Sequence, residues 1–98
     1  MRITESKGFR ATTLFCSGVL DDSTSMQLQN DIFRAAKKQS NIVLDFSDIE
    51  SCTKDSVETI MKGARFVWGR RGTFIIQNAN SKVKPVFQKE GGGRMLGY

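Results

Sequence analysis

The residues from Asp45 to Thr59 offer the most chemistry in this sequence. Their order is Asp-Phe-Ser-Asp-Ile-Glu-Ser-Cys-Thr-Lys-Asp-Ser-Val-Glu-Thr. Thr53 and Ser56 place hydroxyls at the start of an expected helix. Free backbone N–H groups and the positive end of the helix dipole favour an anion or a phosphoryl group there. The same residues, or Asp55, could instead cap the helix, and from the residues alone capping is the favoured interpretation.

The rest of the sequence offers no residue set typical of catalysis or metal binding. Histidine is absent, which removes the commonest general base and the commonest metal ligand. Cys16 and Cys52 are too few for a structural zinc site, and we expect both to be reduced thiols in or near a core. Gly91–Gly93 lacks the lysine and hydroxyl of a phosphate-binding loop. We therefore expect no enzymatic activity, no catalytic residue, no metal and no cofactor.

Apolar spacing predicts the elements that position this segment. The expected helices cover residues 25–38, 55–68 and a short stretch near 83–87, and the expected strands cover residues 2–5, 9–16, 42–46 and 73–77, with 94–98 as a further edge strand. Helices that alternate with buried strands imply parallel pairing through right-handed crossovers. The predicted fold is α/β, with a four- to five-stranded mixed β-sheet and helices packed on it.

Capping residues predict where the helices begin. Ser23 or Asp22 is expected to cap the first helix, and Asp55 with Glu58 is expected to form a capping box at the second. Ser81 is expected to cap the third. Residues 47–54 are predicted to form a polar connection between a strand and the second helix.

Size and charge limit the function further. The 98 residues suit a single domain, residues 1–98. Residues 61–98 carry eight Lys or Arg and one acid, and residues 1–60 carry seven and nine, so along the sequence the net charge of +5 arises in the C-terminal part. These cations are scattered and not interleaved with aromatic residues, which argues against specific nucleic-acid binding. No hydrophobic leader or bilayer-spanning run is visible, so we expect a soluble cytoplasmic protein without membrane insertion.

Several segments together resemble the STAS domain, which is the fold of bacterial anti-sigma-factor antagonists and of the cytosolic tails of sulfate transporters. The similar segments are Gly18–Asp21, Ile42–Glu50, Gly72–Ala79 and Val83–Gly91, in the family's order. The resemblance covers about residues 9–97 and implies the same α/β fold.

The resemblance also assigns a phosphoacceptor position. Antagonists of this family carry Asp-Ser-Ser/Thr-Gly there, and the partner kinase phosphorylates the serine that follows the aspartate. Aligned without gaps, this chain has Thr53, Lys54, Asp55 and Ser56 at those four positions, so a lysine that cannot accept the phosphate stands at the switch. An alignment with a two-residue insertion would make Ser56 the acceptor, but it would shift the apolar pattern of the following helix.

The resemblance implies a non-enzymatic protein-interaction module, either an anti-sigma-factor antagonist or a related partner-switch regulator, without the usual serine switch. Its partner would be an anti-sigma-factor-like kinase. The implied partner-binding residues are Asp21, Asp22, Ser23, Thr53, Lys54, Asp55 and Ser56. One alternative is an accessory STAS-like subunit of a lipid or anion transporter, which would bind the transporter ATPase. A further alternative is a small basic binder of nucleic acid or nucleotide.

Overall fold

The computed structural model describes residues 1–97, which form a sheet with helices packed on it. In chain order the elements are β1 (Arg2–Lys7), β2 (Thr12–Leu20), α1 (Asp22–Ala36), β3 (Asn41–Cys52), α2 (Lys54–Gly69), β4 (Thr73–Gln77), α3 (Lys84–Lys89) and the 3-10 helix η1 (Gly93–Met95). The strand order is β1-β2-β3-β4, with β1 antiparallel to β2 and the other neighbours parallel. The predicted α/β fold with a mixed sheet is confirmed.

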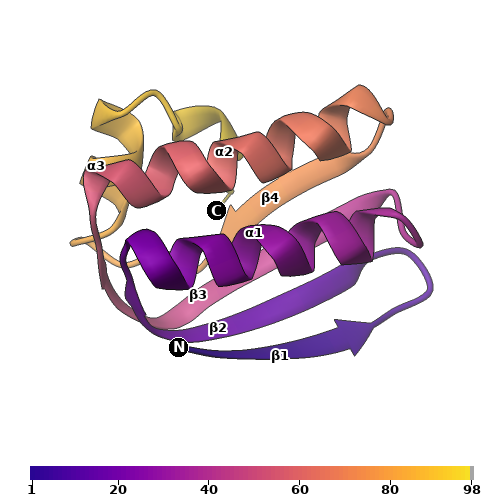
Figure 1. Cartoon of the computed structure of the whole chain (residues 1–98), viewed down its shortest axis with the longest axis horizontal. Coiled ribbons are helices and arrows are strands. Elements are labelled where there is room, and N and C mark those ends of the chain that lie inside the picture. Colours follow the sequence, from indigo (N-terminus) through magenta and orange to yellow (C-terminus); the bar gives the residue numbers. More distant parts are fainter. Residues whose placement is uncertain (98) are drawn as a thin grey trace.

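The core lies between one face of this sheet and the two long helices, α1 and α2, which run side by side across it (Figure 1). Its largest fully buried side chains are Phe46, Phe87, Leu14, Leu20, Leu28, Ile32, Ile42, Leu44, Ile49, Ile60, Ile76 and Met95. The helices approach closely at Gly63, where a Cβ atom would lie 3.0 Å from Cγ2 of Ile32. Phe87 of α3 meets Phe46 of β3 edge to face, with ring centroids 6.0 Å apart, and so attaches α3 to the core.

The opposite face of the sheet holds a buried carboxylate. Asp45 is only 6% exposed, and it accepts hydrogen bonds from the backbone N–H and hydroxyl of Ser47 at 2.9 and 2.6 Å. Its second oxygen accepts from Nε2 of Gln77 at 3.2 Å and Nδ2 of Asn78 at 3.0 Å. Burial acts to raise the pKa of Asp45, but these four hydrogen bonds outweigh it and the pKa is lowered. The carboxylate therefore joins the middle of β3 to the end of β4.

The structure moves several predicted boundaries. The strand predicted at residues 42–46 continues to Cys52, because Ile49 enters the core and the end of β2 pairs with residues 48–52. The predicted polar connection over 47–54 is therefore wrong, and a single residue, Thr53, separates β3 from α2. The N-terminal strands are also shifted, and they meet in a hairpin closed by a hydrogen bond from Gly8 N–H to Ala11 C=O.

The C-terminal segment does not form the predicted strand over residues 94–98. It forms η1 and then a single parallel bridge between Leu96 and Ile76, and residue 98 lies outside the described part. The segment is held beside α2 by Arg94, whose guanidinium lies 4.8 Å from the ring centroid of Trp68.

The α2–β4 turn is a Schellman motif with an unusual residue in it. Gly72 N–H donates to Val67 C=O and Arg71 N–H donates to Trp68 C=O, the two bonds that define this motif. Arg71 occupies the left-handed position, with φ 63°, where glycine is the usual residue. A side chain in this conformation is strained, so Arg71 costs stability.

We expect Arg71→Gly to stabilise the protein by about 1 kcal/mol, because glycine adopts the left-handed conformation without strain. Urea unfolding of both proteins measures the difference. Arg70→Gly is the matched control, since Arg70 has a negative φ and its guanidinium stacks on Phe66 at 5.5 Å, so that change should destabilise. An unchanged or lower midpoint for Arg71→Gly would contradict the prediction.

Candidate functional site

The starts of α1 and α2 lie side by side at the carboxyl end of the parallel strands. Leu20, the last residue of β2, pairs with Cys52, the last residue of β3. The backbone N–H of Thr53 then donates to the carbonyl of Leu20 at 2.9 Å, which links the two chain segments directly. The structure thus brings together the two segments that the sequence singles out, residues 21–23 and 53–56. In open α/β sheets this end of the strands is the usual place for binding.

Asp21 is the N-cap of α1, rather than the predicted Ser23 or Asp22. One of its carboxylate oxygens accepts from the backbone N–H groups of Thr24 at 2.9 Å and Ser23 at 3.1 Å. The hydroxyl of Thr24 accepts from Asp21 N–H at 2.8 Å, which completes a capping box. The hydrogen bonds that the carboxylate accepts, first from Thr24 N–H and then from the hydroxyls of Ser23 and Thr24, hold the pKa of Asp21 below its ordinary value. Asp22 and Ser23 are left exposed on the surface.

Thr53 is the N-cap of α2, and the predicted capping box of Asp55 with Glu58 is wrong. The hydroxyl oxygen of Thr53 accepts from Ser56 N–H at 3.3 Å. The hydroxyl of Ser56 donates to Thr53 C=O at 2.6 Å, and the side chain is fully buried. Glu58 instead forms an ion pair with Arg65 further along α2, at 3.2 Å, and does not reach the cap. Of the hydroxyls in residues 53–56, only that of Thr53 reaches the surface.

Lys54 is the first residue of α2, and its side chain is exposed. Among residues 1–97 it makes no ion pair within 4.0 Å. A cation at this position faces the positive end of the helix dipole, which disfavours it by a few tenths of a kcal/mol to about 1 kcal/mol. An acidic residue at this position would stabilise the first turn of α2 relative to lysine. The stability of the helix therefore does not explain why a lysine is present.

The two thiols of the chain are not activated nucleophiles. The nearby thiol of Cys52 has a pKa raised by burial, and burial followed by the charge of Asp45 raises the pKa of Cys16 to about 12, so both thiols stay protonated at neutral pH. No group of three or more potential metal ligands comes together in the described residues. Within residues 1–97, no helix has the length and hydrophobicity needed to cross a bilayer.

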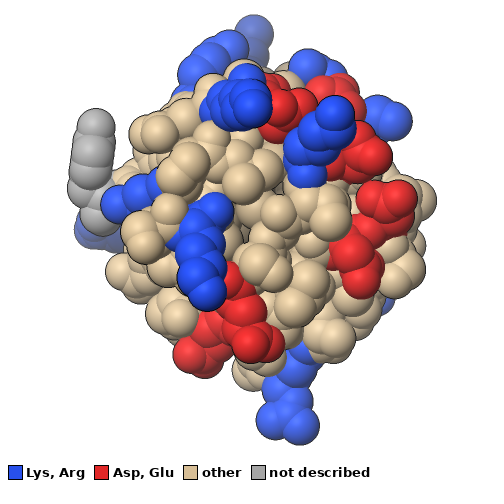
Figure 2. All heavy atoms as spheres, turned by 90° about the vertical axis from the view of Figure 1, so that its left-hand side faces the viewer, with Lys and Arg blue, Asp and Glu red and all other residues tan. Residues whose placement is uncertain are grey.

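Two acidic residues near the site and one turn residue elsewhere were not predicted from the sequence. Asp48 and Glu50 are exposed on the last half of β3, which leads to the start of α2, because that half is a strand and not a loop. Figure 2 looks onto this end of the molecule and shows acidic side chains in several groups, interspersed with Lys and Arg. Asn80, not the predicted Ser81, accepts from two backbone N–H groups ahead of α3, at 2.8 and 3.0 Å. The available signal for the longer strand was the alternation of the polar Asp48 and Glu50 with the apolar Ile49.

This arrangement is the STAS fold of anti-sigma-factor antagonists, as the resemblance in the sequence predicted. The anti-sigma factor antagonist SpoIIAA in its unphosphorylated form superposes with a TM-score of 0.84 at 20% identity, over 98% of this chain and 86% of that one. An antagonist from Mycobacterium paratuberculosis gives 0.79 at 15% identity, over 92% and 77%. A serine-to-glutamate variant of RsbS from Moorella thermoacetica gives 0.74 at 13% identity, over 93% and 79%.

The same fold was also found in the phosphorylated form of the Bacillus cell-fate determinant SpoIIAA, with a TM-score of 0.75 at 19% identity, over 98% of this chain and 89% of that one. No protein-family model matches the sequence, and no curated protein matches it significantly. The likeness therefore rests on structure, and at these identities it establishes the fold.

Proposed function

We propose that this chain is a non-enzymatic protein-interaction module of the anti-sigma-factor antagonist kind, which binds its partner through the paired starts of α1 and α2. The support is the likeness of its fold to several antagonists, one of them known in both unphosphorylated and phosphorylated forms. Its partner is an anti-sigma-factor-like kinase. The partner contacts Asp21, Asp22 and Ser23 together with Thr53, Lys54 and Asp55. Ser56, which the resemblance also implies as a partner-binding residue, is fully buried and does not contact the partner.

Lys54 is the observation that carries the proposal. It stands at the position that the gap-free alignment gives to the phosphoacceptor, it is exposed, and its charge opposes the helix dipole. Lys54 destabilises its own helix and is exposed at the paired starts of α1 and α2. A contact with a partner best explains a residue with these two properties. Its ammonium group would pair with a carboxylate of that partner. Because lysine has no hydroxyl, phosphorylation at this position cannot switch the binding off.

The alternative acceptor, Ser56, fits the structure poorly. A kinase needs the hydroxyl in the open, whereas the hydroxyl of Ser56 is buried and donates to Thr53 C=O at 2.6 Å. Exposing it would require the first turn of α2 to unwind. The burial of Ser56 therefore supports the alignment without an insertion, in which binding is not regulated by phosphorylation at this position.

Affinity purification from the native cell tests the proposal, with the wild-type chain and Lys54→Glu as baits. We expect the wild type to capture a kinase-like or sigma-regulating protein, and Lys54→Glu to weaken its binding by about tenfold or more, because a charge pair becomes a repulsion. Lys54→Glu should be at least as stable as the wild type, because an acidic residue suits the start of a helix. Loss of binding can then not be attributed to unfolding.

Lys62→Glu is the matched control, because Lys62 is also exposed on α2 but lies two turns from the site. It should leave capture unchanged. Recovery of an ATPase and a permease would favour the transporter-subunit alternative, and recovery of neither partner class would refute the antagonist proposal. With the partner and ATP, label incorporated at Ser56 would show that the two-residue insertion is correct.

A further inference from the structure

Seven exposed cations gather at the end of the molecule opposite the candidate site. They come from the β1–β2 hairpin, from the last turn of α1 with the loop behind it, and from the turn after α2. The seven, which we call the basic end, are Lys7, Arg10, Arg34, Lys37, Lys38, Arg70 and Arg71. In Figure 1 these segments all lie at the right-hand side, where β2, β3 and β4 begin.

The basic end accounts for the whole net charge of the chain. The carboxylates near it are Glu5, which pairs with Lys7 at 3.6 Å, and Asp31, which pairs with Arg34. The chain has 15 Lys or Arg and 10 Asp or Glu, so the other eight cations are balanced by the other eight acids. The formal charge of +5 is therefore concentrated at one end of the fold. Along the sequence, by contrast, the excess of Lys and Arg over Asp and Glu lies in residues 61–98.

Hydrogen bonds hold the segments of the basic end in one continuous surface. Nδ2 of Asn41 donates to the carbonyl of Arg10 at 2.8 Å, and the hydroxyl of Thr73 donates to Oδ1 of Asn41 at 2.8 Å. The backbone N–H of Thr73 also donates to Ser40 C=O at 3.0 Å. The hairpin, the loop before β3 and the turn before β4 are thus fixed relative to one another, and their cations are presented together.

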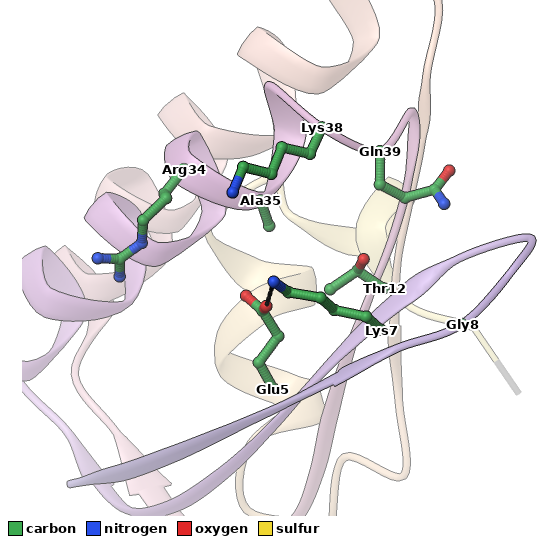
Figure 3. A pocket seen from close by; sticks show the side chains of 8 residues that line it. All are labelled: Glu5, Lys7, Gly8, Thr12, Arg34, Ala35, Lys38 and Gln39. Carbon is green, nitrogen blue, oxygen red and sulfur yellow. Dashed lines mark ion pairs between the residues drawn. The ribbon is translucent and has the colours of Figure 1, made fainter.

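A hollow of about 210 Å³ opens in this surface between β1 and the end of α1. Lys7, Arg34 and Lys38 contribute to its lining, with Glu5 as its one acid. Figure 3 shows the amino groups of Lys7 and Lys38 directed into the space between the strand and the helix. In residues 1–97 the ammonium group of Lys38 has no carboxylate partner within 4.0 Å. The hollow is therefore an electropositive recess that suits a phosphate-bearing head group.

The tip of the hairpin adds an apolar group to the same surface. Phe9 is 98% exposed and lies next to Arg10 in the loop between β1 and β2. A phenylalanine that contacts almost nothing in its own protein does not stabilise the fold. Beside cations, such a ring suits the boundary between lipid head groups and acyl chains, where aromatic residues and basic residues act together.

We propose that the basic end docks on the surface of an anionic lipid bilayer, with Phe9 at the head-group boundary and one head group in the hollow beside Lys38. The cations are spread over an end of the molecule whose two extents are 25 and 24 Å, so the charge covers an area rather than a line. A single nucleic-acid strand would follow a line and would stack on several aromatic rings, whereas this end offers one. The inference goes beyond the proposed function, and it leaves the starts of α1 and α2 facing away from the bilayer.

Co-sedimentation with vesicles tests this docking. We expect the chain to bind vesicles that contain phosphatidylserine and not vesicles of phosphatidylcholine alone, with affinity that falls as salt is raised. The double change of Lys37→Gln and Lys38→Gln should weaken binding roughly 30-fold, since each cation near the surface contributes about a fivefold factor. Phe9→Ser should weaken it about tenfold by removing the buried ring.

The matched control is the double change of Lys62→Gln and Lys82→Gln, which removes the same charge from exposed positions outside the basic end. It should leave vesicle binding within about twofold of the wild type, because these cations do not face the bilayer. Equal losses in the two double variants would overturn the proposal, as would equal binding to both kinds of vesicle. Tighter binding to a labelled single-stranded oligonucleotide than to phosphatidylserine vesicles would also overturn it, in favour of nucleic acid.

Discussion

Gly72→Ala is expected to destabilise the protein by about 3 kcal/mol, because the turn before β4 has no room for a methyl group. A Cβ atom at Gly72 would lie 2.0 Å from the carbonyl oxygen of Ser40 and 2.8 Å from Cγ1 of Val67. The carbonyl cannot easily move, since it accepts the N–H of Thr73 at the start of β4. The variant must therefore separate the beginnings of β3 and β4. Urea unfolding, followed by circular dichroism, measures the loss.

Gly69→Ala is the matched control for this prediction, since Gly69 ends the same helix and nothing lies within 4 Å of the position of its Cβ atom. Alanine favours the helix over glycine, so this variant should be stabilised by up to about 1 kcal/mol. The two alanines, three residues apart, should thus act in opposite directions. Similar unfolding midpoints for Gly72→Ala and the wild type would show that the turn can rearrange.

Asp45→Asn is expected to cost about 2 kcal/mol at neutral pH, because the buried carboxylate accepts four hydrogen bonds and makes no ion pair within residues 1–97. The effect should depend on pH. The folded-state pKa of Asp45 is lowered, so its ionised form contributes stability above its ordinary pKa, and the contribution is lost as the pH falls through the folded value. The wild type and the variant should therefore converge in acid.

Thermal unfolding of both proteins from neutral to acidic pH measures this convergence. Asp21 also has a lowered pKa, but it is present in both proteins and cancels from the difference. Asp48→Asn is the matched control, since Asp48 lies on the same strand and is exposed. It should change stability by less than about 0.5 kcal/mol. A difference between Asp45→Asn and wild type that stays constant with pH would contradict the assignment.

Elements defined by their own apolar pattern were predictable from the sequence. β4 was predicted to the residue, since its short continuous apolar run lies between Gly72 and Asn78, which both break a strand. The second half of β3 was not predictable from local composition, because it is a strand only through pairing with the end of β2. The predicted fifth strand failed for a related reason: only Leu96 reaches β4, and the chain before it turns into η1.

The position of the candidate site was predictable, but its details were not. Several capping residues follow one another at each helix start, and sequence cannot tell which of them caps. The hydrogen bond from Thr53 N–H to Leu20 C=O decides it, because it fixes where both strands end and makes Asp21 and Thr53 the caps. The basic end could not be seen in the sequence at all, because three separate segments of the chain contribute to it.

The stacking of Arg94 on Trp68 makes the C-terminal segment observable by fluorescence. Trp68 is the only tryptophan of the chain, and it is partly buried at the place where Arg94 of η1 stacks on α2. Release of η1 would remove the guanidinium from the indole and admit water to the ring without unfolding the sheet. The intrinsic emission of the protein therefore reports the docking of its last turn separately from the unfolding of its core, and no added dye is needed.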